Sequence, residues 1–174
     1  MTRFIRKFFR KEDGTFTIEF VMWVPFMLVL LTSVVESSMF MTRWMLLDRA
    51  LDLAVRDLRI NTYASPSFEE FRGKICEEAH LPDCMDRLQI ELVPVTMQSW
   101  PGLAESPNCI DRAAEIDPID DAVYTPGQAN NLMTIRACAL MSPMFANVGL
   151  GALLPKDENG EYQVLAFSAY VQEP

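Results

Sequence analysis

Histidine is nearly absent from this sequence, in which His80 is the only one among 174 residues. The four cysteines contain no CxxC pair, so the ligand spacing of an ordinary zinc site is missing. GxSxG, Walker and GxGxxG motifs are missing too. Because the sequence places no nucleophile beside an activating base, we expect a protein that is not an enzyme and that has no cofactor. We interpret His80, at an expected helix end, as a cap or surface group.

Positive charge is scarce beyond the first 14 residues. The formal net charge of the chain is −9, which disfavours a nucleic-acid partner because phosphate binding requires clustered lysine and arginine. Residues 1–14 differ from the rest: five basic side chains and two acidic ones give them a net charge of +3 and leave −12 for the remainder. A basic leader before an apolar run, with an acidic body after it, is typical of an oriented membrane protein.

The apolar run that follows the leader predicts a transmembrane helix over residues 15–36. The run extends over residues 15–35, about the 20 residues that a bilayer requires, and Glu19 is the only charge within it. Glu19 and Glu36 lie near its two ends, where a charge in the membrane costs less. The basic leader is expected to stay in the cytoplasm. The alternatives are a buried core helix and a cleaved secretory signal peptide, but residues 35–38 offer no clean small-residue cleavage site.

The five-residue step from Gly14 to Glu19 marks the boundary between leader and apolar run. This layout resembles a type IV prepilin leader, which a dedicated peptidase cuts after the glycine. Glycine suits such a cut because it has no side chain to obstruct an extended backbone. The resemblance implies a mature chain beginning at Thr15, with the Glu19 carboxylate one helical turn away and able to pair with the amine of a neighbouring subunit. Alternatively, Gly14 is a loop residue and Glu19 an interfacial carboxylate.

The wider segment over residues 12–25 resembles the TadE-like family of tight-adherence pilus assembly. The matching features are Gly14, the pair Glu19 and Phe20, Pro25, and a second glutamate, Glu36, at the end of the apolar run. The resemblance implies a pseudopilin or minor pilin that is processed by a prepilin peptidase. Glu19, Phe20 and Pro25 are then the residues expected to act in helix pairing and assembly.

Beyond the expected membrane segment, a helical pattern continues and predicts an amphipathic helix over residues 37–64. Its apolar stripe recurs at steps of three and four residues: Trp44, Leu47, Leu51, Ala54 and Leu58. Such a stripe packs against a domain core or, alternatively, against a partner helix. Residues 26–65 contain neither glycine nor proline, so we expect one continuous helix from Thr15 to about Ile60.

Residues 65–174 are expected to form an α+β domain on the far side of the membrane. Ser67 and Glu70 predict the start of a short helix through a capping box. Strands are predicted at residues 88–97, 132–141 and 162–171, with Pro94 at a sheet edge or strand end. Together with the long helix, these elements predict a pilin-like α+β fold, in which an amphipathic helix packs on a small antiparallel sheet.

Two other stretches of this domain are irregular. Residues 98–131 are rich in proline, aspartate, asparagine and glycine and predict a long loop, a kind of segment that is usually functional or mobile. Asp117, Asp120 and Asp121 lie in it, but their spacing lacks the pattern of a calcium loop, so no metal site is expected. We interpret residues 144–154 as a loop or short helix against the core or the membrane surface.

All four cysteines, Cys76, Cys84, Cys109 and Cys138, follow the apolar run. An even number on the translocated side favours two disulfides. Cys76 and Cys84 are close in sequence and flank a helix end, so they are the expected first pair. That leaves Cys109, in the long loop, for Cys138 on the second strand. The alternative is that the cysteines are buried as small apolar groups.

These observations predict a single-pass protein of the bacterial inner membrane, with residues 1–14 in the cytoplasm and the α+β domain in the periplasm. Its expected role is structural: a pseudopilin or minor pilin of a tight-adherence type IV pilus. The expected partners are the membrane, a prepilin peptidase and other pilin-like subunits. The alternative is an uncleaved, membrane-anchored binding module whose loop over residues 98–131 engages a partner.

Overall fold

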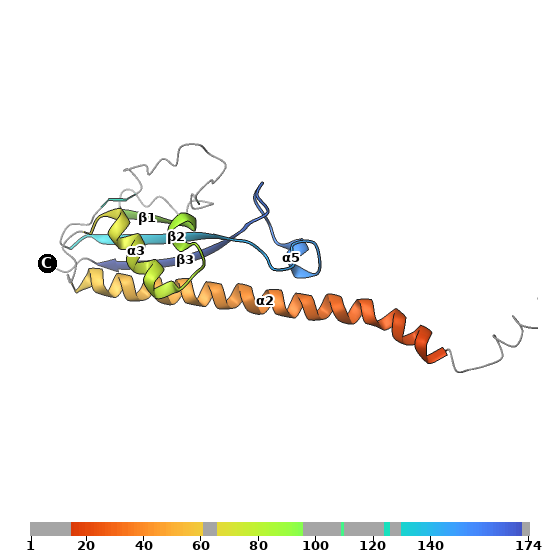
Figure 1. Ribbon diagram of the computed structural model, residues 1–174. Helices are drawn as coiled ribbons and strands as arrows, with labels where there is room; N and C mark the ends of the chain where they lie inside the picture. The colour runs from red at the N-terminus through yellow and green to blue at the C-terminus, as the bar shows by residue number, and fades with distance from the viewer. Residues whose placement is uncertain (1–14, 61–65, 96–108, 110–123, 126–129, 172–174) are drawn as a thin grey trace, which may run out of the picture.

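One long helix lies along a three-stranded antiparallel sheet and extends far beyond it (Figure 1). The computed structural model describes residues 15–60, 66–95, 109, 124–125 and 130–171. Its elements, in chain order, are α2 (Thr15–Arg59), α3 (Phe68–Ala79), α4 (Cys84–Arg87), β1 (Leu88–Val95), β2 (Leu132–Met141), α5 (Leu150–Leu153) and β3 (Tyr162–Val171). The predicted α+β fold, with a candidate membrane helix that continues onto a small antiparallel sheet, is therefore confirmed.

Helix α2 is continuous over 45 residues, close to the extent predicted from the missing glycine and proline. Pro25 lies inside it, in a part of the helix whose apolar side chains are exposed, among them Phe20 and Phe26. Figure 1 shows that only the C-terminal part of α2 lies beside the sheet. The helix thus consists of a free apolar part and a part that belongs to the core.

The core forms where the second part of α2 meets the sheet. Leu47 and Leu51 are fully buried there, as are Ile90 of β1 and Ile135 of β2. Burying such a side chain contributes roughly 1.5–3 kcal/mol. The predicted stripe is correct for its last four members, all of which are buried, and it packs against the protein's own sheet.

Trp44 departs from the predicted stripe, because its side chain is 41% exposed. It lies against strand β3, an edge of the three-stranded sheet, whose outer side has no partner strand among the described residues. The indole N–H of Trp44 donates a hydrogen bond to the carbonyl oxygen of Leu165 on this strand, at 3.0 Å. A tryptophan can supply this hydrogen bond at the rim of the core because it combines an apolar ring with one N–H donor.

Helix α3 begins with the predicted capping box. The Ser67 hydroxyl accepts from the Glu70 amide at 3.3 Å, and the Glu70 carboxylate accepts from the Ser67 amide at 2.9 Å. The hydrogen bond from the Ser67 amide, with a smaller contribution from the Ser67 side chain, lowers the pKa of the Glu70 carboxyl. Phe71 and Ile75 on the opposite face are buried in the core, so α3 covers the same apolar side of the sheet as α2.

The sheet has the order β1–β2–β3, with both neighbouring pairs antiparallel. Pro94 lies in the edge strand β1, as predicted, where a missing N–H is tolerated. Tyr124 forms a parallel bridge with Leu92 of β1, and its hydroxyl donates to the carbonyl of Pro66 at 3.1 Å. Burial raises the pKa of the Tyr124 phenol. This contact was not predicted, since Tyr124 falls within the expected long loop.

Most of the loop predicted over residues 98–131 lies outside the described residues, and so do Asp117, Asp120 and Asp121. Within the described part of the chain, no group of three or more histidine, cysteine, aspartate or glutamate side chains could hold a metal ion.

Candidate functional site

The N-terminal part of α2 is the most conspicuous feature that the fold leaves without an internal role. It is long and apolar enough to cross a membrane, and none of its most apolar stretch is buried inside the structure. Phe16, Val21 and Leu31 are each more than half exposed. Exposed apolar surface of this size is typical of a site that contacts a membrane or another protein, so this part of α2 is a candidate membrane span.

Glu19 lies on this exposed apolar part of α2. Its side chain is exposed, and among the described residues no cation forms an ion pair with it. The helix begins at Thr15, so Thr15 and Glu19 lie one turn apart on the same face. Gly14 lies outside the described residues, as does the rest of the leader. Phe20 is 60% exposed and lies next to Glu19.

Glu36 is placed quite differently, although it is the other glutamate of the apolar run. Its side chain is fully buried. The carboxylate accepts hydrogen bonds from the backbone N–H of Met144, at 3.0 Å to Oε2, and of Phe145, at 3.0 Å to the same oxygen. Hydrogen bonds from N–H groups stabilise a buried carboxylate, as charge-assisted bonds are the strong ones. Glu36 therefore fastens the segment after β2 to the helix.

Ser33, one turn before Glu36, makes a second attachment. Its hydroxyl donates to the Val29 carbonyl at 2.7 Å and accepts from the Leu150 amide at 3.2 Å. The backbone comes this close because residue 149 is a glycine with φ of 61°. A Cβ there would lie 2.4 Å from the Ser33 hydroxyl. We call residues 142–156, which include α5, the tip loop.

Charged side chains hold the base of the tip loop. Arg43 of α2 donates to the Ser142 carbonyl at 2.9 Å and also binds the Tyr162 hydroxyl. Arg87 pairs with the buried Glu161 at 3.0 Å, and the Ser142 hydroxyl donates to the same carboxylate. The tip loop is thus connected to α2, to α4 and to the start of β3, and these bonds fix its position relative to α2.

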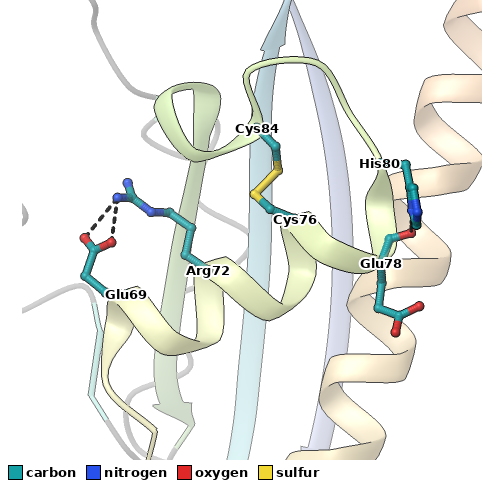
Figure 2. Close-up of a disulfide and its surroundings, with 6 residues drawn as sticks. All are labelled: Glu69, Arg72, Cys76, Glu78, His80 and Cys84. Carbon is teal, nitrogen blue, oxygen red and sulfur yellow. Dashed lines mark hydrogen bonds and ion pairs between the residues drawn. A yellow bond between two sulfur atoms is a disulfide. The ribbon is translucent and has the colours of Figure 1, made fainter.

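Two disulfides close the domain. Cys76 of α3 is joined to Cys84 at the start of α4 (Figure 2), with Cα atoms 5.5 Å apart. Cys109 is joined to Cys138 of β2, with Cα atoms 5.4 Å apart. This is the pairing expected from the sequence. The first disulfide holds the turn after α3, in which His80 and Asp83 have positive φ.

His80 is the C-cap of α3, in the left-handed conformation with φ of 50°. Its amide donates to the Cys76 carbonyl at 3.2 Å, and its ring Nδ1 lies 3.0 Å from the carbonyl oxygen of Glu78 (Figure 2). Arg72, on the same helix, pairs with Glu69 at 2.8 Å. These are local helix-end and helix-surface contacts, which agrees with the expectation that His80 is a cap or surface group.

The geometry is that of an exposed apolar helix with one unburied carboxylate, rigidly attached to a small domain. Residues 14–56 match the family model of TadE-like proteins. The TadE-like segment includes the whole exposed part of α2, Glu36, and part of the stripe that enters the core. No curated protein and no solved structure matches the chain at a significant level. The resemblance predicted from the sequence is therefore confirmed by the family model, and the match suggests a component associated with a tight-adherence pilus.

Sequence reasoning did not find the attachments of the tip loop. Glu36 was noted only as a charge at the end of the apolar run and as part of the family resemblance, and Ser33, Arg43 and Glu161 were not singled out. The available signals were a carboxylate at the end of an apolar run and the two closely spaced glycines, Gly149 and Gly151. Neither signal shows that the carboxylate and the glycine-containing segment contact each other, because the residues that form the hydrogen bonds are more than 100 positions apart.

Proposed function

We propose that the chain is a pseudopilin or minor pilin, a structural component of tight-adherence pilus assembly. The observation that carries this proposal is the exposed, apolar part of α2 within a segment that matches TadE-like proteins. An apolar helix of this length inserts into a bilayer, and after insertion it presents its side chains to lipid or to other helices. The basic leader keeps the N-terminus in the cytoplasm, which puts the disulfide-bonded domain in the periplasm.

In this proposal a prepilin peptidase cuts after Gly14 and leaves Thr15 as the first residue. The new amine and the Glu19 carboxylate then lie on neighbouring turns of the same helix. A charge at the membrane centre opposes insertion by roughly 2.5–3.5 kcal/mol. Glu19 lies near the edge of the segment, where the cost is smaller, and pairing between subunits offsets it. Since a bond between the amine of one subunit and Glu19 of the next fixes their stagger, Glu19 would set the register of packed helices. Phe20 directly follows Glu19, and Pro25 lies six positions after Glu19 on the same helix.

The mature N-terminus tests this function. The chain is expressed in cells with and without a prepilin peptidase, and its intact mass and N-terminal sequence are determined. Cells with the peptidase should yield a chain that begins at Thr15. Gly14→Phe should leave a heavier, unprocessed chain in the same cells, because the large side chain obstructs the cleft. A wild-type chain that retains Met1 in the presence of an active peptidase contradicts the proposal and favours an anchored, uncleaved binding module.

A further inference from the structure

The tip loop is the part of the domain that lies closest to the exposed part of α2. Figure 1 shows α5 and its loop beside α2, at the end of the domain that faces the N-terminus of the helix. The amide of Leu150 is bonded to Ser33, and those of Met144 and Phe145 to Glu36. The level of the tip loop along the helix is therefore that of residues 33–36.

That level coincides with one edge of the expected membrane segment. With a rise of 1.5 Å per residue, residues 15–35 extend over about 31 Å, close to the roughly 30 Å thickness of a bilayer's hydrocarbon core. Ser33 and Glu36 then lie where the hydrocarbon meets the headgroups. Since hydrogen bonds connect the tip loop to these two residues, it must lie at nearly the same depth.

The surface of the tip loop suits that depth. Leu153 is 81% exposed, Met144 57% and Val148 44%, so three apolar side chains project from a short segment. No charged residue lies between Arg136 and Lys156 in a chain whose net charge is −9. Carboxylates would be repelled by anionic headgroups, and the tip loop has none.

Lys156 supplies the single charge of the tip loop. Its ammonium group donates to the carbonyls of Ala146, at 2.7 Å, and Gly151, at 2.9 Å. These bonds hold a positive charge against the loop that carries the exposed apolar side chains. An apolar surface with a neighbouring cation is the combination by which interfacial segments bind lipid.

We propose that the tip loop is a membrane-surface anchor that inserts its apolar side chains between the lipid headgroups beside α2. The inference rests on the proposed insertion of α2 in the membrane, and it adds a second contact between the domain and the bilayer. One helix alone leaves the domain free to tilt about the point where it emerges. A second contact, to the side of the helix, restricts that tilt.

The test measures the depth of single labels in the full-length protein, reconstituted in vesicles of phosphatidylethanolamine and phosphatidylglycerol. Because no cysteine is free among the described residues, Val148→Cys and Leu153→Cys each introduce a unique thiol for an environment-sensitive nitrobenzoxadiazole label. Val171→Cys is the matched control: it is also an exposed valine, at 49%, but it ends β3 at the opposite end of the sheet (Figure 1). Leu30→Cys reports on the membrane segment itself.

The labels at positions 148 and 153 should show blue-shifted emission, quenching by lipid-attached nitroxide and loss of quenching by aqueous iodide. The label at position 171 should show the reverse pattern. Iodide quenching of the tip labels as strong as that of the control would overturn the anchor. If the label at position 30 still lies in lipid in that case, the proposed insertion of α2 remains supported and only the anchor is refuted. Tip labels protected from both quenchers would also overturn it, since protein would then cover the loop.

Discussion

Glu36→Ala tests the attachment of the tip loop to α2. The substitution removes the acceptor of two backbone N–H groups, those of Met144 and Phe145. A hydrogen bond to a charged group contributes about 1.5–3 kcal/mol net, and a buried donor left unsatisfied costs about 1–3 kcal/mol. Met144 is largely exposed, so water can replace part of the lost bonding. We therefore expect the tip loop to lose about 2–4 kcal/mol of local stability.

Glu36→Gln separates charge from shape. The glutamine carbonyl still accepts hydrogen bonds, but as a neutral group, for which each bond contributes about 0.5–1.5 kcal/mol. The expected loss is then about half of that for alanine. Asp52→Ala is the matched control, since it also removes a carboxylate from α2, but from an exposed position. Surface substitutions of that kind usually change stability by less than about 0.5 kcal/mol.

Hydrogen–deuterium exchange of the full-length protein in lipid nanodiscs provides the measurement. A loss of about 2–4 kcal/mol corresponds to roughly 30- to 700-fold faster exchange in the tip loop, since each 1.4 kcal/mol is a factor of ten. The amides of β2 should change much less, because the core does not contain Glu36. Unchanged exchange of the tip loop in Glu36→Ala, or an equal increase in Asp52→Ala, would refute the reasoning.

Three further predictions concern assembly, backbone fit and crosslinks. Glu19→Ala should still fractionate with membrane but fail to support pilus formation, and full complementation of piliation would argue against a pairing role. Gly149→Ala should destabilise the domain by about 1–3 kcal/mol, because its backbone conformation is rare for any residue with a Cβ. The control Gly73→Ala, with open space in a helix, should stabilise it by about 0.5–1 kcal/mol in thermal unfolding. Non-reducing peptide mapping should show both disulfides. On the chain-entropy model, they contribute about 2.5 and 3.5 kcal/mol to the free energy of unfolding. Free thiols in protein isolated without reductant would contradict the periplasmic topology.

The regular elements could be predicted because their signals are local. The strands at residues 132–141 and 162–171 were predicted with the bounds that the structure has, since apolar runs and turn residues mark both ends. The capping box of Ser67 and Glu70 is likewise a four-residue pattern. For α2, the absence of glycine and proline from residues 26–65 allows the helix to continue beyond the apolar run, and Pro25 lies inside the helix without ending it.

The contacts of Trp44 and Glu36 could not be predicted in the same way. Helical spacing assigned Trp44 to the core. Whether its ring is buried, however, depends on how much of this face of α2 the edge strand β3 covers, and the spacing carries no information on that. Glu36 looks like an edge residue of a membrane segment, and only the return of the chain more than 100 positions later supplies its donors. Such partners follow from tertiary structure and leave no periodicity in the sequence.

The unbroken course of α2 from the apolar end into the core has a mechanical consequence. No loop separates the two parts of the helix, and the tip loop braces the place where a hinge would otherwise lie. A turn of the apolar end about its own axis is therefore transmitted to the whole sheet as torque. One residue of helix corresponds to about 100° of rotation, so a shift of a single position in how these helices pack would point the domain in a different direction.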